Sequence, residues 1–303
     1  MIGGRYSGGL VRWLASLYRR SDAVRGYTLL SPTMLVMLAA MAAPMALLAV
    51  YSFWTQEGLA LDMHFTLDRY AEVFSRETYR ELFYRSLYIS SLVTVVTVLL
   101  AYPMAYFVAF HVPQRTKFVW LILLTIPFWT SYLLRVFAWK IILGYNGVIN
   151  SGLMALGVIH QPFEFLLYNT TAVVVTLAHA WAAFAILPIY VSLEKIDRSL
   201  LEAASDLGDG PIRRFFRITL PLSLPGVIGA AVLIFVPTTG DYVTPTLVGG
   251  SDGVMIANVI EVQFAKIGNW PMGAALSIAS MAAVGLITLL SVQAVRMAVA
   301  RTR

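Results

Sequence analysis

The sequence predicts an all-α polytopic membrane protein with six transmembrane helices and both termini in the cytoplasm. The first supporting observation is composition: 59% of the 303 residues are hydrophobic and only 13% are charged. A soluble domain usually has about a quarter of its residues charged, so this chain lacks the polar surface to face water on all sides. The net charge of +6 could indicate nucleic-acid binding. The basic residues, however, lie in short segments between apolar runs, which is typical of membrane topology signals.

The second observation is a set of six long apolar runs. A bilayer core of about 30 Å requires about 20 residues of helix. The runs that qualify are 28–53, 87–111, 118–143, 170–193, 218–240 and 272–295. Prolines lie inside or at the ends of these runs, and a helix bundle tolerates them because neighbouring helices satisfy the freed carbonyl groups. The sequence shows no internal repeat and no separate soluble domain.

The third observation is the distribution of Lys and Arg. With the N-terminus inside, fifteen of them fall on the inner side and five on the outer side, and this bias predicts a cytoplasmic location for both ends. Residues 1–27 then form a basic cytoplasmic tail against anionic lipid headgroups, without the apolar core of a signal peptide. Residues 28–84 hold the first span and an outer loop, and residues 296–303 form the C-terminal tail.

The first outer loop carries a helical pattern of apolar residues. Leu67, Tyr70, Val73 and Phe74 recur at helical spacing within a segment that otherwise mixes acids and arginines. This spacing predicts a helix that lies on the outer membrane surface.

A polar segment of about twenty residues separates the fourth and fifth spans. Ser199 and Glu202 have the spacing of a capping box, which predicts a helix starting at Leu200. Gly208 suits the left-handed position that ends a helix, and Pro211 suits the first turn of a second helix. The segment is therefore expected to be a short helix parallel to the membrane and linked rigidly to two spans.

The residues of this short helix leave two interpretations open. Small Ala203 and Ala204 would let a partner backbone approach closely, with Leu200, Leu201 and Leu207 as apolar anchors. Alternatively, the helix is amphipathic and merely lies on lipid.

The string Glu202-Ala203-Ala204, then Gly208, then Ile218-Thr219-Leu220-Pro221 resembles the loop signature of the binding-protein-dependent permeases of type I ABC importers. The resemblance implies the type I importer permease fold over residues 85–295, with the coupling helix within the loop 199–217. In that family the loop inserts into a cleft of a cytoplasmic ATPase dimer. The residues expected to contact the ATPase are Leu201, Glu202, Ala203, Ala204, Leu207 and Gly208.

Further segments are similar to spermidine/putrescine permeases of the first-subunit type. They are Phe65–Tyr70, Pro127–Thr130, Ile141–Gly144, Gly240–Pro245 and Asn269–Ala275. Arg85 departs from the family, which commonly has Asn there. The resemblance implies a multi-pass protein of the cell inner membrane. Its expected partners are a second, different permease, a periplasmic substrate-binding protein, the ATPase and membrane lipid.

The chain itself is not expected to be an enzyme or to bind a cofactor. It contains no Gly-x4-Gly-Lys-Ser/Thr phosphate loop, so ATP and Mg would be held by the separate ATPase. His64 and His160 are too isolated to form a metal site, and no nucleophile with a neighbouring base suggests catalysis.

Ionisable residues within spans are costly and mark possible substrate contacts. Asp241 could pair with an alkyl-ammonium group, and aromatic rings would add cation–π contacts. The rings considered are Tyr242, Trp129, Tyr132 and Trp181. Alternatively, Asp241 caps a helix end or pairs with Arg135.

Three other charged or titratable residues lie in or near the spans. For Arg135, pairing with Asp241 or Glu261 is favoured over substrate contact. Lys140 is expected to anchor its helix end. His179 is expected to bond a neighbouring carbonyl or to line the pathway.

The favoured function is thus an ATP-driven importer permease for polyamines or similar small organic cations. An amino acid or an opine is the alternative substrate class. An ion-coupled carrier remains an alternative of another class, although it would need inverted repeats with matching broken helices. A membrane scaffold or sensor is disfavoured because no signalling domain is attached.

Overall fold

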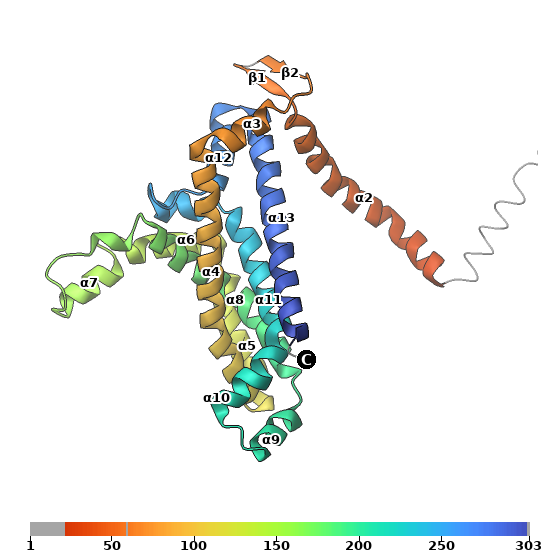
Figure 1. Cartoon of the computed structure of the whole chain (residues 1–303). Helices are drawn as coiled ribbons and strands as arrows, with labels where there is room; N and C mark the ends of the chain where they lie inside the picture. The colour runs from red at the N-terminus through yellow and green to blue at the C-terminus, as the bar shows by residue number, and fades with distance from the viewer. Residues whose placement is uncertain (1–21, 59, 302–303) are drawn as a thin grey trace, which may run out of the picture.

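The computed structural model describes residues 22–58 and 60–301, which are mostly helical (Figure 1). The basic tail expected over residues 1–27 therefore lies largely outside the described residues. The α-helices are α2 (Asp22–Tyr51), α3 (Asp68–Ser75), α4 (Glu77–Phe110), α5 (Gln114–Thr125), α6 (Tyr132–Leu143), α7 (Val148–Ala155), α8 (Thr170–Glu194), α9 (Arg198–Asp206), α10 (Pro211–Arg214), α11 (Leu220–Thr239), α12 (Ile256–Glu261) and α13 (Trp270–Arg301).

Short irregular helices and one hairpin complete the description. The 3₁₀ turns are η1 (Ile126–Trp129) and η2 (Glu164–Leu166), and the π turns are η3 (Phe215–Thr219), η4 (Pro245–Gly249) and η5 (Val262–Ile267). Strands β1 (Thr55–Glu57) and β2 (Ala60–Asp62) pair antiparallel, with Gln56 opposite Leu61.

Six helical stretches of the described chain are long and apolar enough to cross a membrane, as predicted. They are Gly26–Tyr51, Glu77–Phe110, Tyr132–Ala155, Thr170–Glu194, Pro211–Thr239 and Trp270–Val295.

The third of these differs from the prediction, because residues 118–143 do not form one helix. Pro127 has no backbone N–H to donate, so the helix tightens into η1, and Thr130 and Ser131 are then extended. The apolar run correctly predicted a segment that is hydrophobic enough to cross a membrane. It did not predict that the helix breaks at Pro127.

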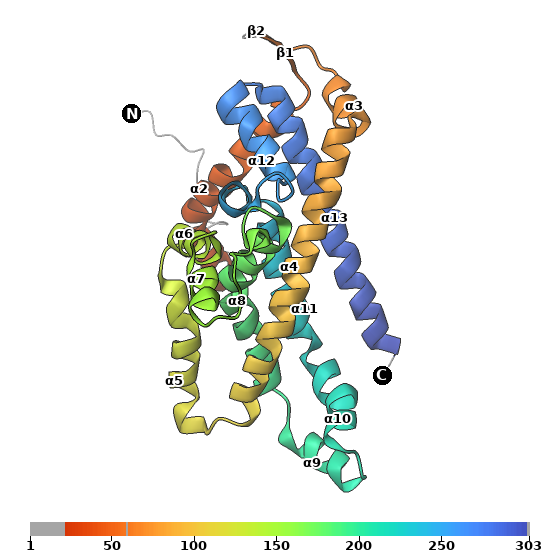
Figure 2. The ribbon, with the colours of Figure 1, turned by 90° about the vertical axis from the view of Figure 1, so that its left-hand side faces the viewer.

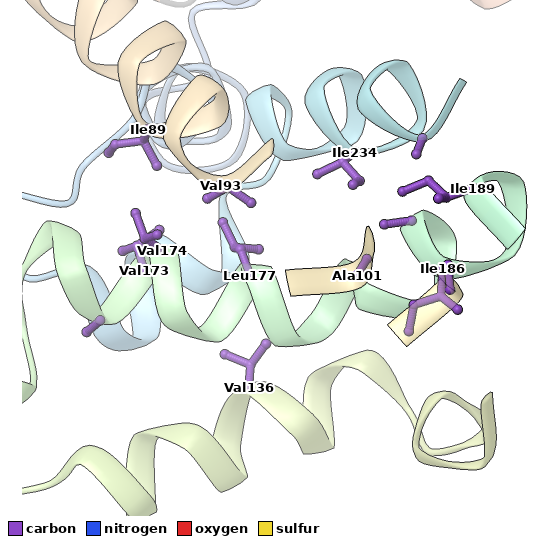
Figure 3. Packing of buried hydrophobic residues seen from close by; sticks show 14 of the residues in the cluster. Ile89, Val93, Ala101, Val136, Val173, Val174, Leu177, Ile186, Ile189 and Ile234 are labelled. Carbon is purple, nitrogen blue, oxygen red and sulfur yellow. The ribbon is translucent and has the colours of Figure 1, made fainter. Parts of the chain in front are cut away.

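Helix α8 lies at the centre of the bundle and packs against α4 and α11. It is the most enclosed of the six helices, because 61% of the residues in its apolar stretch are buried inside the protein. Figure 3 shows Leu177 of α8 between Val93 of α4 and Val136 of α6, with Ile234 of α11 nearby. The apolar residues of three helices therefore meet on a single central helix.

The contact between α8 and α11 is especially close at Gly226. A Cβ added there would lie 2.4 Å from both the carbonyl oxygen of Pro188 and the Oγ of Ser192. Only glycine allows the two backbones to approach this closely.

Helix α2 stands away from the bundle and touches it through α13 (Figure 1). None of the residues in its apolar stretch is buried inside the protein. This exposure on every side is compatible with contact to lipid rather than water.

The bundle has two dissimilar ends, which both views show (Figures 1 and 2). Helices α9 and α10 lie at one end, and α3, α12 and the hairpin lie at the other.

The helix predicted from the apolar spacing in the first outer loop is present as α3, but its apolar residues divide. Val73 is buried against Tyr79 and Met272 of the bundle, whereas Leu67 and Phe74 remain exposed. Helix α3 is therefore packed partly on protein, a contact that the spacing alone could not indicate.

Candidate functional site

The loop between α8 and α11 begins with a helix cap that differs from the prediction. The carboxylate of Asp197 accepts the backbone N–H of Ser199 at 2.9 Å, and α9 begins at Arg198 rather than at Leu200. Asp197 is as good an N-cap as serine and stands two residues earlier, so it takes the role assigned to Ser199. Hydrogen bonds from the backbone and side chain of Ser199 lower the pKa of Asp197, because they stabilise the ionised carboxylate.

The end of α9 agrees with the prediction. Gly208 has φ +85°, the left-handed conformation that ends helices. The next residue, Asp209, donates its backbone N–H to the carbonyl oxygen of Ala204 at 2.9 Å. The chain therefore reverses immediately after α9.

The side chain of Asp209 holds this reversal in place. It is only 6% exposed and accepts from Arg213 at 3.2 Å and from Arg217 at 3.3 Å. Arg214 donates to the Oγ of Ser205 at 2.6 Å, which ties α10 back to α9. Asp209 is not among the residues for which the sequence predicted a role. The Asp-x3-Arg spacing, which places the two side chains one helical turn apart, was the signal that could have identified it.

The residues predicted to contact a partner differ in exposure. Glu202 and Ala203 are exposed, and Leu207 is 86% exposed at the tip of the loop. Leu201 is half-buried, and Ala204 is 5% exposed, so its small side chain serves the packing of the loop itself.

Beside these residues the loop is hollowed by a depression of about 330 Å³. It is lined by Phe110, Arg198, Leu201, Glu202, Ser205, Asp206 and Arg214. Apolar, acidic and basic groups therefore meet at one exposed surface next to Leu207.

Within the membrane-spanning part, Asp241 is fully engaged by the protein. One carboxylate oxygen accepts the backbone N–H groups of Val243 at 2.9 Å and Thr244 at 3.3 Å. The other accepts the hydroxyl of Tyr132 at 2.5 Å, and that hydroxyl also lies 2.6 Å from the Oγ1 of Thr244. Asp241 therefore caps the turn leading into η4, as its structural alternative predicted.

The expected pairing of Arg135 with Asp241 or Glu261 is wrong. The guanidinium of Arg135 lies 4.9 Å from the centre of the Phe128 ring and donates to the carbonyl oxygen of Ala180 at 3.4 Å. Arg135 therefore makes a cation–π contact and a hydrogen bond to a backbone carbonyl in place of the expected ion pair. Glu261 lies 3.7 Å from Lys266 instead.

The remaining residues predicted to line the substrate path do not all lie together. The ring of Trp181 lies 6.2 Å from that of Tyr132, and its Nε1 is a buried donor without a partner in residues 22–58 and 60–301. Tyr132, Trp181 and Asp241 are thus brought together. His179 is exposed and lies against Trp139 at 5.5 Å, not on a carbonyl.

Trp129 and Tyr242 lie elsewhere. Trp129 is 82% exposed. Tyr242 lines a different cavity of about 720 Å³ between α11, η5 and α13, where Glu261 supplies the one carboxylate of the lining. Sequence reasoning did not associate Glu261 with Tyr242, because the two are distant along the chain. Among the described residues no cluster of three potential metal-ligating side chains occurs.

Comparison with known proteins identifies a class and then a family. The fold resembles that of a bacterial ABC transporter involved in the import of the acidic polysaccharide alginate. The TM-score is 0.70 at 17% identity, covering 94% of this chain and 99% of that one. A bacterial alginate ABC transporter in complex with an alginate pentasaccharide-bound periplasmic protein gives a TM-score of 0.69 at 18% identity, covering 92% of this chain and 95% of that one. The fold is therefore that of an ABC importer permease.

Sequence comparison is more specific. Residues 32–303 match the family described as the inner membrane component of binding-protein-dependent transport systems, and the chain belongs to this family. It is 38% identical over 247 residues to the spermidine/putrescine transport system permease protein PotB of Escherichia coli K12, covering 81% of this chain and 89% of that protein. The protein is accordingly a multi-pass component of the inner membrane.

Proposed function

We propose that this chain is a permease subunit of an ATP-driven importer for spermidine, putrescine or related small organic cations. The observation that carries the proposal is the extended similarity to a spermidine/putrescine permease, which spans most of both chains. The intact loop signature and its exposed surface support the energy-coupling part.

In this proposal the end of the bundle that carries α9 faces the cytoplasm and docks on an ATPase dimer. Leu207 and Glu202 are exposed for that contact, while Gly208 and Asp209 fix the shape of the loop. ATP and Mg are held by the ATPase. Closure of that dimer pushes α9, and the push passes into α8 and α11, which flank the loop.

The opposite end receives substrate from a periplasmic binding protein. A second, different permease completes the translocation path. In one chain of six spans, α2 and the outer faces of the bundle remain exposed and are available for contact with such a partner. The periplasmic partner in this proposal is supported by the alginate transporter, which was solved in complex with a periplasmic protein.

For the substrate path we favour the group formed by Tyr132, Trp181 and Asp241. The aromatic faces can stabilise a desolvated ammonium group by cation–π contact. The charge of Asp241 adds attraction, although its oxygens already accept three hydrogen bonds. Asp241 is therefore expected to orient Tyr132 more than to bind substrate directly.

The test is uptake of labelled spermidine and putrescine by the complete transporter in proteoliposomes, with ATP inside. Glu202→Lys reverses a charge on the exposed loop and should abolish uptake while the ATPase continues to hydrolyse ATP. Gly208→Val places a β-branched residue at positive φ and should have the same effect. Gly208→Asn is the matched control, because asparagine tolerates this conformation and should retain uptake.

Unchanged uptake with Glu202→Lys and Gly208→Val would contradict the coupling role. Uptake of an amino acid or an opine in place of polyamines would contradict only the substrate assignment. Uptake driven by an ion gradient without ATP would instead support a secondary carrier.

A further inference from the structure

An ion pair between a buried lysine and a partly exposed glutamate joins three helix ends next to the loop, at a place that the loop signature does not include. Lys117, near the start of α5, is only 4% exposed. Its Nζ donates to both oxygens of Glu194, the last residue of α8, at 2.8 and 2.7 Å. It also donates to the carbonyl oxygen of Ala109, in the last turn of α4, at 2.9 Å.

The carbonyl oxygen of Ala109 is a good acceptor for physical reasons. The last four carbonyl groups of a helix have no partner within the helix and carry the negative end of its dipole. Two cations meet this oxygen, since Arg198 at the start of α9 also donates to it at 3.5 Å. The end of α4 is thereby linked to α5 and to the first residue of α9.

The chain between α8 and α9 is fixed by packing as well. Ile196 lies between the two helices, is 8% exposed and belongs to the main apolar core. Glu194, Ile196 and Arg198 therefore hold the entrance to α9 with an ion pair, an apolar contact and a hydrogen bond. The other end of the loop is held differently, by the ion pairs of Asp209 with its arginines and by the ring of Phe215, which lies 5.6 Å from that of Tyr102 in α4.

A buried ion pair is poor evidence for stability, because apolar residues of similar volume often stabilise a protein equally well or better. What the ion pair adds is geometry. The Nζ of Lys117 binds the carboxylate of Glu194 and the carbonyl of Ala109 at the same time, so charge-assisted hydrogen bonds link the ends of α4, α5 and α8.

We infer that Lys117 and Glu194 are positioning residues for energy coupling. They make the ends of α4, α5 and α8 a single rigid body, so that displacement of α9 moves all three helices together. Without the pair, α9 would tilt relative to the bundle, and part of the movement imposed by the ATPase would not reach α4, α5 and α8. This inference rests on the proposed function and assigns it two residues outside the loop.

The test measures transported spermidine per hydrolysed ATP in the complete reconstituted transporter. Lys117→Met together with Glu194→Met removes both charges and leaves an apolar contact that is expected to fold. The ratio should fall about fivefold or more, within the usual range of coupling between distant sites. Glu194→Gln is the matched control, since its amide oxygen still accepts from Lys117 and should keep the ratio near that of the unaltered protein. An unaltered ratio in the double variant would overturn the inference.

A second measurement does not depend on these variants. The chain contains no cysteine, so Gln114→Cys and Ser199→Cys would attach spin labels at two defined exposed positions, on α5 and α9. The distance between the labels should be the same in the nucleotide-free and ATP-bound complex if the junction moves as one body. A change in that distance on ATP binding would overturn the inference. If the double methionine variant does not assemble, this distance decides alone.

The two proposals fail separately. Unaltered uptake with Glu202→Lys contradicts the coupling role of the loop itself. An unaltered transport ratio, or a changed label distance, contradicts only the rigid junction of Lys117 and Glu194.

Discussion

The loop around α9 and the polar group around Asp241 both depend on the side chain of an aspartate, yet they differ in where the partners of that side chain lie. Asp209 is bound by Arg213 and Arg217, four and eight residues along the chain. Asp241 is bound by Tyr132, which is 109 residues away. The loop is thus a locally determined structure that can present a surface, whereas the membrane group exists only after α6 and α11 have packed.

Helix α11 connects these two regions, and its packing on α8 offers the largest expected effect. In Gly226→Ala the new Cβ would meet the carbonyl oxygen of Pro188 and the Oγ of Ser192. The helices must separate, which we expect to cost about 1–3 kcal/mol of stability, as overpacking does. The thermal midpoint of the purified transporter measures this effect.

Gly229→Ala is the matched control on the same helix, because nothing lies within 4 Å of its added Cβ. It should be neutral or stabilising, since alanine favours helix over glycine by about 1 kcal/mol. Equal midpoints for the two variants would show that the two regions are not joined by a close α8–α11 contact.

Substitutions at Asp241 test the membrane group directly, and we expect them to change stability by an intermediate amount. Asparagine keeps an oxygen for the N–H groups of Val243 and Thr244, whereas alanine does not. Asp241→Ala should therefore lose about 0.5–2 kcal/mol, the usual value of an N-cap, and Asp241→Asn much less. Thermal unfolding and spermidine uptake are measured in parallel. Loss of uptake in Asp241→Asn without loss of stability would instead assign the charge to the substrate path.

The smallest effect is expected at the cap of α9. The folded pKa of Asp197 is lowered from 3.8, so its contribution is present above that value and is lost as the pH falls through the folded pKa. Hydrogen-exchange protection of the Ser199 amide should decrease across this acidic range. Asp197→Asn should abolish the pH dependence while keeping the protection, because asparagine caps without titrating. Protection that stays constant with pH in the unaltered protein would remove Asp197 as the cap.

These differences explain how far sequence reasoning reached. Apolar runs predicted the six spans, since length and hydrophobicity alone decide whether a helix can cross a membrane. The left-handed end at Gly208 was predicted because only the local backbone determines it. The break at Pro127 was missed, since a bundle can either tolerate a proline or bend around it.

Contacts between distant segments were the main failure. Arg135 was expected to pair with a carboxylate, yet it lies over the Phe128 ring, while Asp241 accepts the hydroxyl of Tyr132, which is 109 residues away. The Lys117–Glu194 pair was also not predicted. Both residues stand at helix ends, where a charge ordinarily faces water, and the burial of Lys117 arises only once α4, α5 and α8 have packed together.

The π turn η3 has a consequence for how the loop is aimed. A π turn holds one residue more than an α-helical turn, so Phe215–Thr219 shifts the phase between α10 and α11. Deleting one residue there would preserve both helices but rotate everything before it by about 100° relative to α11. The direction in which Leu207 faces therefore depends on the number of residues in η3 as well as on side-chain contacts. An insertion or deletion at this point would leave the loop folded but turn it away from its partner.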